Sequence, residues 1–354
     1  MQHADISSIT RDLAGLVAER YVFPGPAAEI SRRLEHGLAE GRHAAVPDEE
    51  ALATALTHDL QSLNGDKHLR LLYSVAELPG VAELPEAAGL PGLAGQAGPA
   101  GQAGRDKEAA ELAAMTAYAQ RTAGGIARAE RLDGNVGYLD LRPLLFPPVV
   151  AGEAVAAAMT LIAPAEALLL DLRRCLGGSP DMVAMVCSYL FGDEPVHLID
   201  VIDRPAADGT AAVRQSWTMP FTPGRRFGPD KPVFVLTSGT TFSGGEELSY
   251  DLQQLGRAVV VGERTRGGAH PVERFPIRPH LQATIPVARA HSPVSGGNWE
   301  GTGVLPDVPV PAGEALGVAY QRALAHVLAL GDEGERAETS AEARRALDAC
   351  HAPA

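Results

Sequence analysis

Residues 231–248 read KPVFVLTSGTTFSGGEEL, and the fold can be predicted outward from this strand–loop–helix pattern. The apolar run over residues 231–237 is typical of a buried strand, and residues 246–255 have the pattern of a helix. The polar loop between them ends in Ser243, so the serine hydroxyl is expected at a helix N-terminus, where backbone N–H groups favour a developing negative charge. Serine is also a favoured helix cap, and this stretch alone leaves both roles open.

The same alternation of strand and helix extends to both sides of this stretch. Short apolar runs predict buried strands, and segments with helical spacing lie between them. The expected strands are residues 136–141, 167–172 and 258–262, and the expected helices are residues 151–162 and 181–190. This order predicts an α/β layer structure with a largely parallel sheet.

The two ends of the chain are predicted to be helical. Apolar residues at helical spacing and proline-containing breaks indicate three short helices within residues 5–63, and the tail from residue 313 to about 349 is rich in Ala, Leu, Arg and Glu. We therefore divide the chain into a helical N-terminal subdomain (1–74), a Gly/Ala/Pro-rich linker or loop (75–106), an α/β catalytic core (107–312) and a helical tail (313–354).

A glycine recurs at every third position within the linker. The glycines are Gly89, Gly92, Gly95, Gly98, Gly101 and Gly104. Six triplets are too few to expect a collagen triple helix, so we interpret the segment as a linker or mobile loop.

Composition limits the classes of function. The chain has 354 residues, a formal charge of −14 and three cysteines, Cys175, Cys187 and Cys350. Such an acidic chain is poorly suited to bind nucleic acid or an anionic membrane, and the cysteines are too scattered for a zinc site. No secretory signal or membrane-spanning run is recognised, so we expect a cytoplasmic protein. We also expect no metal or cofactor. The sequence leaves a homo-oligomer open.

A second loop of interest follows the predicted strand at residues 167–172. It reads DLRRCLGGSP over residues 171–180 and contains Gly177 and Gly178. A glycine pair here places backbone N–H groups at the carboxyl end of a sheet, where ligands bind in parallel α/β folds. An ordinary tight turn fits the pattern equally well.

His68 is the candidate base. It lies in the turn Asn-Gly-Asp-Lys-His at residues 64–68, and a lone loop histidine usually has no catalytic role. The chain has only three lysines, Lys67, Lys107 and Lys231, so a serine–lysine pair has few candidates whereas a serine–histidine pair has an obvious one.

Four motifs in order resemble the tail-specific (C-terminal-processing) serine peptidase family. They are DLRxxxGG (171–178), TSxxTFSxxE (237–246), VGExTxGG (261–268) and EGxGVxPDV (300–308). The most similar branch contains the interphotoreceptor retinoid-binding protein repeats and, more distantly, the tricorn core protease. The resemblance implies a crotonase/ClpP-like α/β core with a helical N-terminal subdomain and without a PDZ domain.

The resemblance also implies roles for individual residues. Ser243 matches the nucleophile, His68 the general base and Glu300 the acidic residue of the charge-relay set, while Gly244, with Gly177 or Gly178, matches the oxyanion-hole donors. The processing proteases use a lysine about two dozen residues after the serine. This chain has no lysine there, so the histidine-based mechanism is preferred.

The expected function is therefore that of a serine hydrolase that cleaves a peptide, or a related amide or ester, through an acyl-enzyme. Its partner would be a peptide or a small acyl substrate. Two alternatives remain: a non-proteolytic protein that binds an apolar ligand such as a retinoid or fatty acid, and an acyl-transfer enzyme of a biosynthetic pathway. Function depends on the site rather than the scaffold, so the motifs alone do not decide among them.

Overall fold

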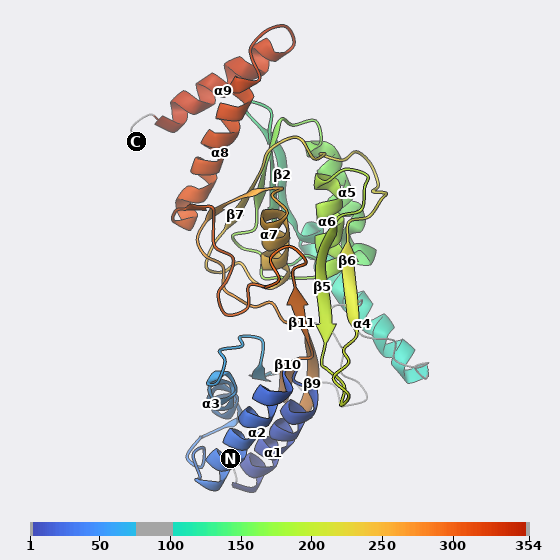
Figure 1. Ribbon diagram of the computed structural model, residues 1–354, viewed down its shortest axis with the longest axis vertical. Helices are drawn as coiled ribbons and strands as arrows, with labels where there is room; N and C mark the ends of the chain where they lie inside the picture. Colours follow the sequence, from blue (N-terminus) through green and yellow to red (C-terminus); the bar gives the residue numbers. More distant parts are fainter. Residues whose placement is uncertain (1–2, 76–101, 352–354) are drawn as a thin grey trace. The chain divides into compact units, whose positions relative to one another are not determined.

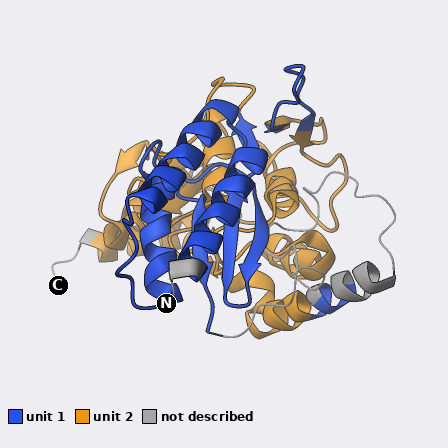
Figure 2. Cartoon of the chain, turned by 90° about the horizontal axis from the view of Figure 1, so that it is seen from below, with its two compact units in different colours: residues 1–113, 200–214, 268–291 blue, residues 114–199, 215–267, 292–354 orange. Residues whose placement is uncertain are grey.

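The structure is a computed structural model that describes residues 3–75 and 102–351. The predicted linker at 75–106 lies largely outside these residues, and of the repeat glycines only Gly104 is described, within helix α4 (Gln102–Arg121). The described residues form two compact units (Figure 2). Unit 1 contains residues 1–113, 200–214 and 268–291, and unit 2 contains residues 114–199, 215–267 and 292–354.

Unit 2 is built on a six-stranded sheet of order β12-β8-β7-β4-β3-β2. All neighbouring strands run parallel except β2 and β3, which form an antiparallel pair. The strands are β2 (Ile126–Leu132), β3 (Val136–Leu141), β4 (Ala167–Asp171), β7 (Val233–Thr237), β8 (Val259–Gly262) and β12 (Val308–Pro309). The predicted parallel α/β core is confirmed.

Helices cover both faces of this sheet (Figure 1). On one face lie α5 (Pro148–Ile162), α6 (Pro180–Leu190) and α7 (Gly244–Gln254), and on the other lies α8 (Ala312–Ala329). The alternation of side chains along each strand explains this arrangement. In β4, for example, Leu168 and Leu170 pack toward α5 and α6, whereas Leu169 packs toward α8. The central strands are apolar on both faces for this reason.

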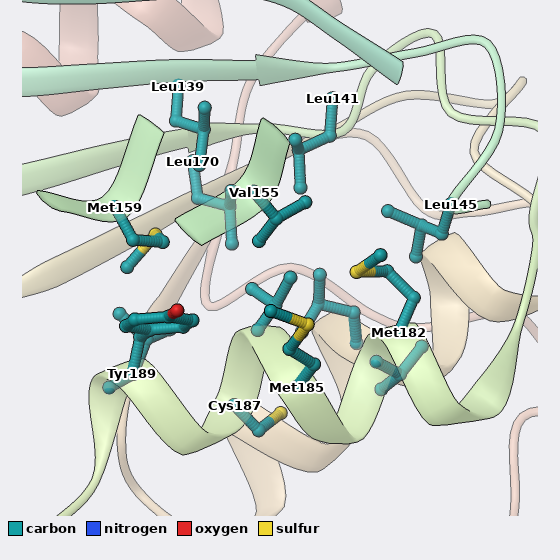
Figure 3. Packing of buried hydrophobic residues seen from close by; sticks show 14 of the residues in the cluster. Leu139, Leu141, Leu145, Val155, Met159, Leu170, Met182, Met185, Cys187 and Tyr189 are labelled. Atoms are coloured by element: carbon teal, nitrogen blue, oxygen red, sulfur yellow. The ribbon is translucent and has the colours of Figure 1, made fainter. Parts of the chain in front are cut away.

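Large side chains fill the layer between the sheet and α6 (Figure 3). Leu139, Leu141 and Leu170 extend from the sheet, and Met182, Met185 and Tyr189 extend from α6 to meet them. These residues are nearly completely buried. Their packing fixes the orientation of α6 and of the glycine-containing loop that precedes it.

Unit 1 combines three helices with a small antiparallel sheet. The helices are α1 (His3–Arg20), α2 (Pro24–Ala39) and α3 (Glu49–Gln61), and the sheet has the order β1-β10-β9, with β1 (Arg70–Tyr73), β10 (Leu281–Pro286) and β9 (Val272–Arg278). Leucine and isoleucine side chains from the helices and from β1 and β10 share one apolar cluster. The three N-terminal helices are confirmed as predicted.

Some features depart from the sequence prediction. The tail is helical, as predicted, but it is divided into α8 and α9 (Arg336–His351) by a segment in which Gly331 and Gly334 have positive φ angles. The strands of unit 1 were not predicted, nor was the sheet β11-β5-β6, formed by β11 (Ala288–His291), β5 (His197–Asp203) and β6 (Val213–Trp217). In the described ranges, no helix is both long and apolar enough to cross a membrane.

Candidate active site

Ser243 sits at the turn between β7 and α7, as the sequence predicted. It is the N-cap of α7, it is half-buried, and its backbone has φ 51° and ψ −122°. A non-glycine residue rarely adopts a positive φ, and such strained residues cluster at active sites. An ordinary cap residue has an extended backbone. The conformation of Ser243 is therefore unlike that of a simple helix cap.

The glycine loop after β4 lies directly against this serine. β4 and β7 are parallel neighbours, with Asp171 opposite Leu236, so both loops leave the same edge of the sheet. A Cβ atom added to Gly177 would lie 2.8 Å from the Ser243 Cβ. A Cβ added to Gly244 would lie 3.0 Å from the Gly178 nitrogen. The two backbones approach so closely that side chains at these positions would collide.

The backbone N–H groups of Gly178 and Gly244 have no backbone hydrogen-bond partner within the described ranges. By contrast, the Gly177 carbonyl and the Ser179 N–H are bound by Leu145, at 2.8 and 2.7 Å. The loop is thus fixed on both sides of Gly178, whose own N–H has no hydrogen-bond partner among the residues that the structure describes. Two such donors beside a serine are what an oxyanion hole requires.

Side-chain hydroxyls join the serine loop to the loop after β4. Thr241 Oγ1 donates to the Leu172 carbonyl at 2.9 Å, and Ser238 Oγ donates to the Arg173 carbonyl at 2.6 Å. Arg173 in turn forms hydrogen bonds and an ion pair with the buried carboxylate of Asp171. Burial alone would raise the pKa of Asp171, but hydrogen bonds from Arg173 and Tyr138 lower it, so the carboxylate stays charged and anchors the loop.

Glu246 also fixes the serine, a role that was not predicted from the sequence. Its fully buried carboxylate accepts hydrogen bonds from the Ser243 N–H at 2.9 Å, the Thr265 hydroxyl at 2.5 Å and the Gly267 N–H at 2.6 Å. The sequence contains a signal for the first bond, because a Glu three residues after a Ser at a helix start is the capping-box pattern. The other two bonds come from a loop that no local pattern connects to α7.

Glu300 lies in a turn of unit 2 that is held to this network. Its N–H donates to Asn298 Oδ1 at 2.9 Å, and the preceding Trp299 is buried against the ring of Tyr250 in α7. Further along the chain, the Gly303 N–H donates to the Trp299 carbonyl and the Val304 N–H donates to Thr265 Oγ1. The same threonine binds Glu246, so the Glu300 turn and the serine turn share a support.

His68 belongs to unit 1, in the turn between α3 and β1. Its N–H donates to Asp66 Oδ1 at 3.0 Å, and its carbonyl accepts from Thr284 Oγ1 at 2.6 Å. Asp66 is almost fully buried and also binds the ring of His270, with Asp66 Oδ2 and His270 Nδ1 2.9 Å apart. His270 carries no signal in the sequence, because no motif joins residues 204 positions apart.

Known proteins match both parts of the chain. The family model for peptidase family S41 matches residues 135–310, and the model for the N-terminal domain found with this peptidase family in eukaryotic interphotoreceptor retinoid-binding protein matches residues 2–96.

Among solved structures, a putative peptidase from Parabacteroides merdae is 16% identical with a TM-score of 0.57, over 94% of this chain and 99% of that chain. Mature CPAF is 14% identical with a TM-score of 0.56, over 93% and 99% of the two chains. The photosystem II D1 C-terminal processing protease is 16% identical with a TM-score of 0.50, over 88% and 94%. At these identities the structures support the crotonase/ClpP-like fold, and the family models carry the assignment. The chain belongs to peptidase family S41, with the N-terminal domain of the interphotoreceptor retinoid-binding protein type.

Proposed function

We propose that this protein is a serine peptidase in which Ser243 attacks the carbonyl carbon of a peptide bond, or of a related amide or ester. The observation that carries the proposal is the strained backbone of Ser243 beside the unused N–H groups of Gly178 and Gly244. The strain has no use in a helix cap, whereas a nucleophile must be exposed and held beside oxyanion donors.

In the proposed reaction, His68 accepts the proton of the Ser243 hydroxyl as the oxygen bonds to the substrate carbonyl. The negative charge that develops on the substrate oxygen is stabilised by the glycine N–H groups. His68 then gives the proton to the leaving amine, and water releases the acyl group by the same steps. Glu300 would stabilise the protonated imidazole.

The environment of Lys231 supports a histidine rather than a lysine as the base. Lys231 Nζ donates to the Ala163 carbonyl at 2.6 Å and lies 4.0 Å from the centre of the Phe227 ring. This ammonium group thus binds the carbonyl of the residue that caps the C-terminus of α5. It is therefore committed to the fold of unit 2 away from the serine turn.

Labelling with a fluorophosphonate, followed by mapping of the modified peptide, tests the proposal without knowledge of the substrate. We expect the probe on Ser243. Ser243→Ala and Ser243→Gly should remove labelling, and the glycine variant should retain the stability of the cap, because glycine is a tolerable N-cap. His68→Ala should slow labelling by roughly 10²–10⁴-fold. Lys231→Ala is the control and should label at the rate of the wild type.

The opposite results would refute the proposal. A probe-reactive Ser243→Gly protein would exclude Ser243 as the nucleophile. If Lys231→Ala abolished labelling while His68→Ala still labelled, the histidine mechanism would be excluded. A folded wild type that takes no probe but binds a retinoid or a fatty acid tightly would favour the binding-protein alternative.

A further inference from the structure

Asp66 is a buried carboxylate in unit 1 that binds three different partners. Its Oδ1 accepts the His68 N–H, and its Oδ2 accepts the Tyr21 hydroxyl and the His270 ring nitrogen, at 2.9 Å each. Only 1% of Asp66 and 6% of His270 is exposed. Water therefore contributes little to stabilising the carboxylate, and these side chains replace it.

The bond to Oδ1 has an ordinary structural reading. An aspartate that accepts the N–H two residues later forms an Asx turn, and this turn needs only one carboxylate oxygen. Oδ2 is held by residues that are distant in sequence. Tyr21 follows α1, its hydroxyl also accepts from Asn64 Nδ2 at 2.6 Å, and His270 precedes β9. The turn alone does not require this second set.

The charge of Asp66 is maintained inside the unit. Burial by itself would raise the pKa of Asp66, but the hydrogen bond and charge of His270, followed by the charge of His68 and the Tyr21 bond, lower it below its usual 3.8. The carboxylate therefore remains negative at neutral pH, two residues from the candidate base.

His68 is tied to this carboxylate through its backbone. The N–H of His68 is held by Asp66, and its carbonyl is held by Thr284 from β10. A residue fixed at both backbone polar groups has little freedom to shift its backbone, which is where its side chain is attached. A change in Asp66 would consequently reach the His68 imidazole both through position and through charge.

We infer that Asp66 and His270 form a positioning pair for His68. His270 holds the Asp66 carboxylate, and Asp66 fixes the His68 turn. The negative charge of Asp66 also stabilises the imidazolium that forms when His68 accepts the serine proton. The inference rests on the proposed role of His68 as the general base. Neither member of the pair is assigned contact with the substrate.

The test is the rate of fluorophosphonate labelling of Ser243 as a function of pH, normalised to the folded fraction of each variant. Asp66→Asn removes the charge but keeps the shape. We expect its plateau rate to fall by at least roughly tenfold, within the ~10⁴-fold range of general-base catalysis. We also expect the midpoint of its pH profile to move to lower pH, because loss of a nearby negative charge disfavours the protonated imidazole.

Two substitutions of His270 leave Asp66 intact. They test the pair even where the Asp66→Asn protein does not fold. An asparagine amide can take the place of the His270 Nδ1–H as a donor, whereas alanine cannot. His270→Asn should therefore label several-fold faster than His270→Ala. The matched control is His43→Gln, because His43 binds Asp59 at 2.9 Å as a second His–Asp pair of unit 1. It should keep the rate and the pH profile of the wild type.

Three results would overturn the pair. An Asp66→Asn profile identical to that of the control would make Asp66 a structural residue only. Equal rates for His270→Asn and His270→Ala would show that the donor to Asp66 has no effect. A His270→Asn protein as unreactive as His68→Ala would make His270 itself the base. Failure of the wild type to label would instead refute the proposed function.

Discussion

Two buried carboxylates, one in each unit, lie beside the candidate catalytic residues and differ in the groups that donate hydrogen bonds to them. Glu246 binds the backbone of Ser243, and Asp66 binds the backbone of His68; each accepts three hydrogen bonds. The donors to Glu246 are two N–H groups and a hydroxyl, none of which titrates near neutral pH. The donors to Asp66 include an imidazole. The Ser243 turn is thus held by neutral dipoles, whereas the His68 turn depends on a titratable partner.

A third buried acid in unit 2 shows what happens without such donors. Glu247 directly follows Glu246, but burial and the charge of Asp181 raise its pKa to about 8. One turn further along α7, neither oxygen of Asp251 has a hydrogen-bond partner among the described residues, and its pKa is also raised. A carboxylate with donors can stay charged in the interior, and one without them must hold a proton.

The largest effect is expected for Glu246→Gln. A glutamine has one carbonyl oxygen, so its NH₂ group must face either the Ser243 N–H or the Gly267 N–H and leave one backbone donor unpaired. The free energy of unfolding should fall by about 1–3 kcal/mol. Labelling of Ser243 should fall as well, because this bond holds the nucleophile turn. Urea unfolding and probe labelling measure the two effects.

Glu246→Asp is the informative companion to this substitution, because it keeps both acceptor oxygens but shortens the reach. A Glu246→Gln protein with wild-type stability and labelling would show that the three donors do not need a second acceptor oxygen at this position.

Glu247→Gln should have a smaller effect, in the opposite direction and dependent on pH. Because the pKa of Glu247 in the folded state is raised, its contribution to stability is fully present below the unfolded pKa of 4.5 and is lost as the pH rises toward 8. A neutral glutamine does not undergo this loss. Relative to the wild type, the variant should therefore become progressively more stable as the pH rises from 5 to 8.

Urea unfolding at the two pH values measures this gain. Glu153→Gln on the exposed face of α5 is the control and should show no such pH-dependent gain. Equal pH profiles for Glu247→Gln and the wild type would mean that Glu247 is already ionised in the folded protein.

The sequence was sufficient for the core and insufficient for the supports of the site. The strands of the parallel sheet are continuous apolar runs, such as residues 167–172, so their burial on both faces can be predicted from each short stretch alone. β9 and β10 are less distinctive, since they pair with each other and with β1 from a distant part of the chain. The position of Ser243 followed from its strand–loop–helix context. The bonds of Glu246 to Thr265 and of Asp66 to His270 depend on tertiary folding and leave no periodic signal.

The smallest expected effect tests how firmly the His68 turn depends on Asp66. Thr284→Val keeps a β-branched side chain in β10 but removes the hydroxyl that donates to the His68 carbonyl at 2.6 Å. Loss of one such hydrogen bond should cost about 1 kcal/mol of unfolding free energy. Thr10→Val in α1 is the matched control, because the Thr10 hydroxyl is also buried and donates to a backbone carbonyl, that of Ile6, at 2.8 Å. If both backbone ties of His68 set its position, the two variants lose similar stability and only Thr284→Val slows labelling, by a few-fold. If Asp66 alone holds the turn, Thr284→Val should label at the rate of Thr10→Val. Each catalytic turn would then be held by its buried carboxylate alone, the Ser243 turn by Glu246 and the His68 turn by Asp66.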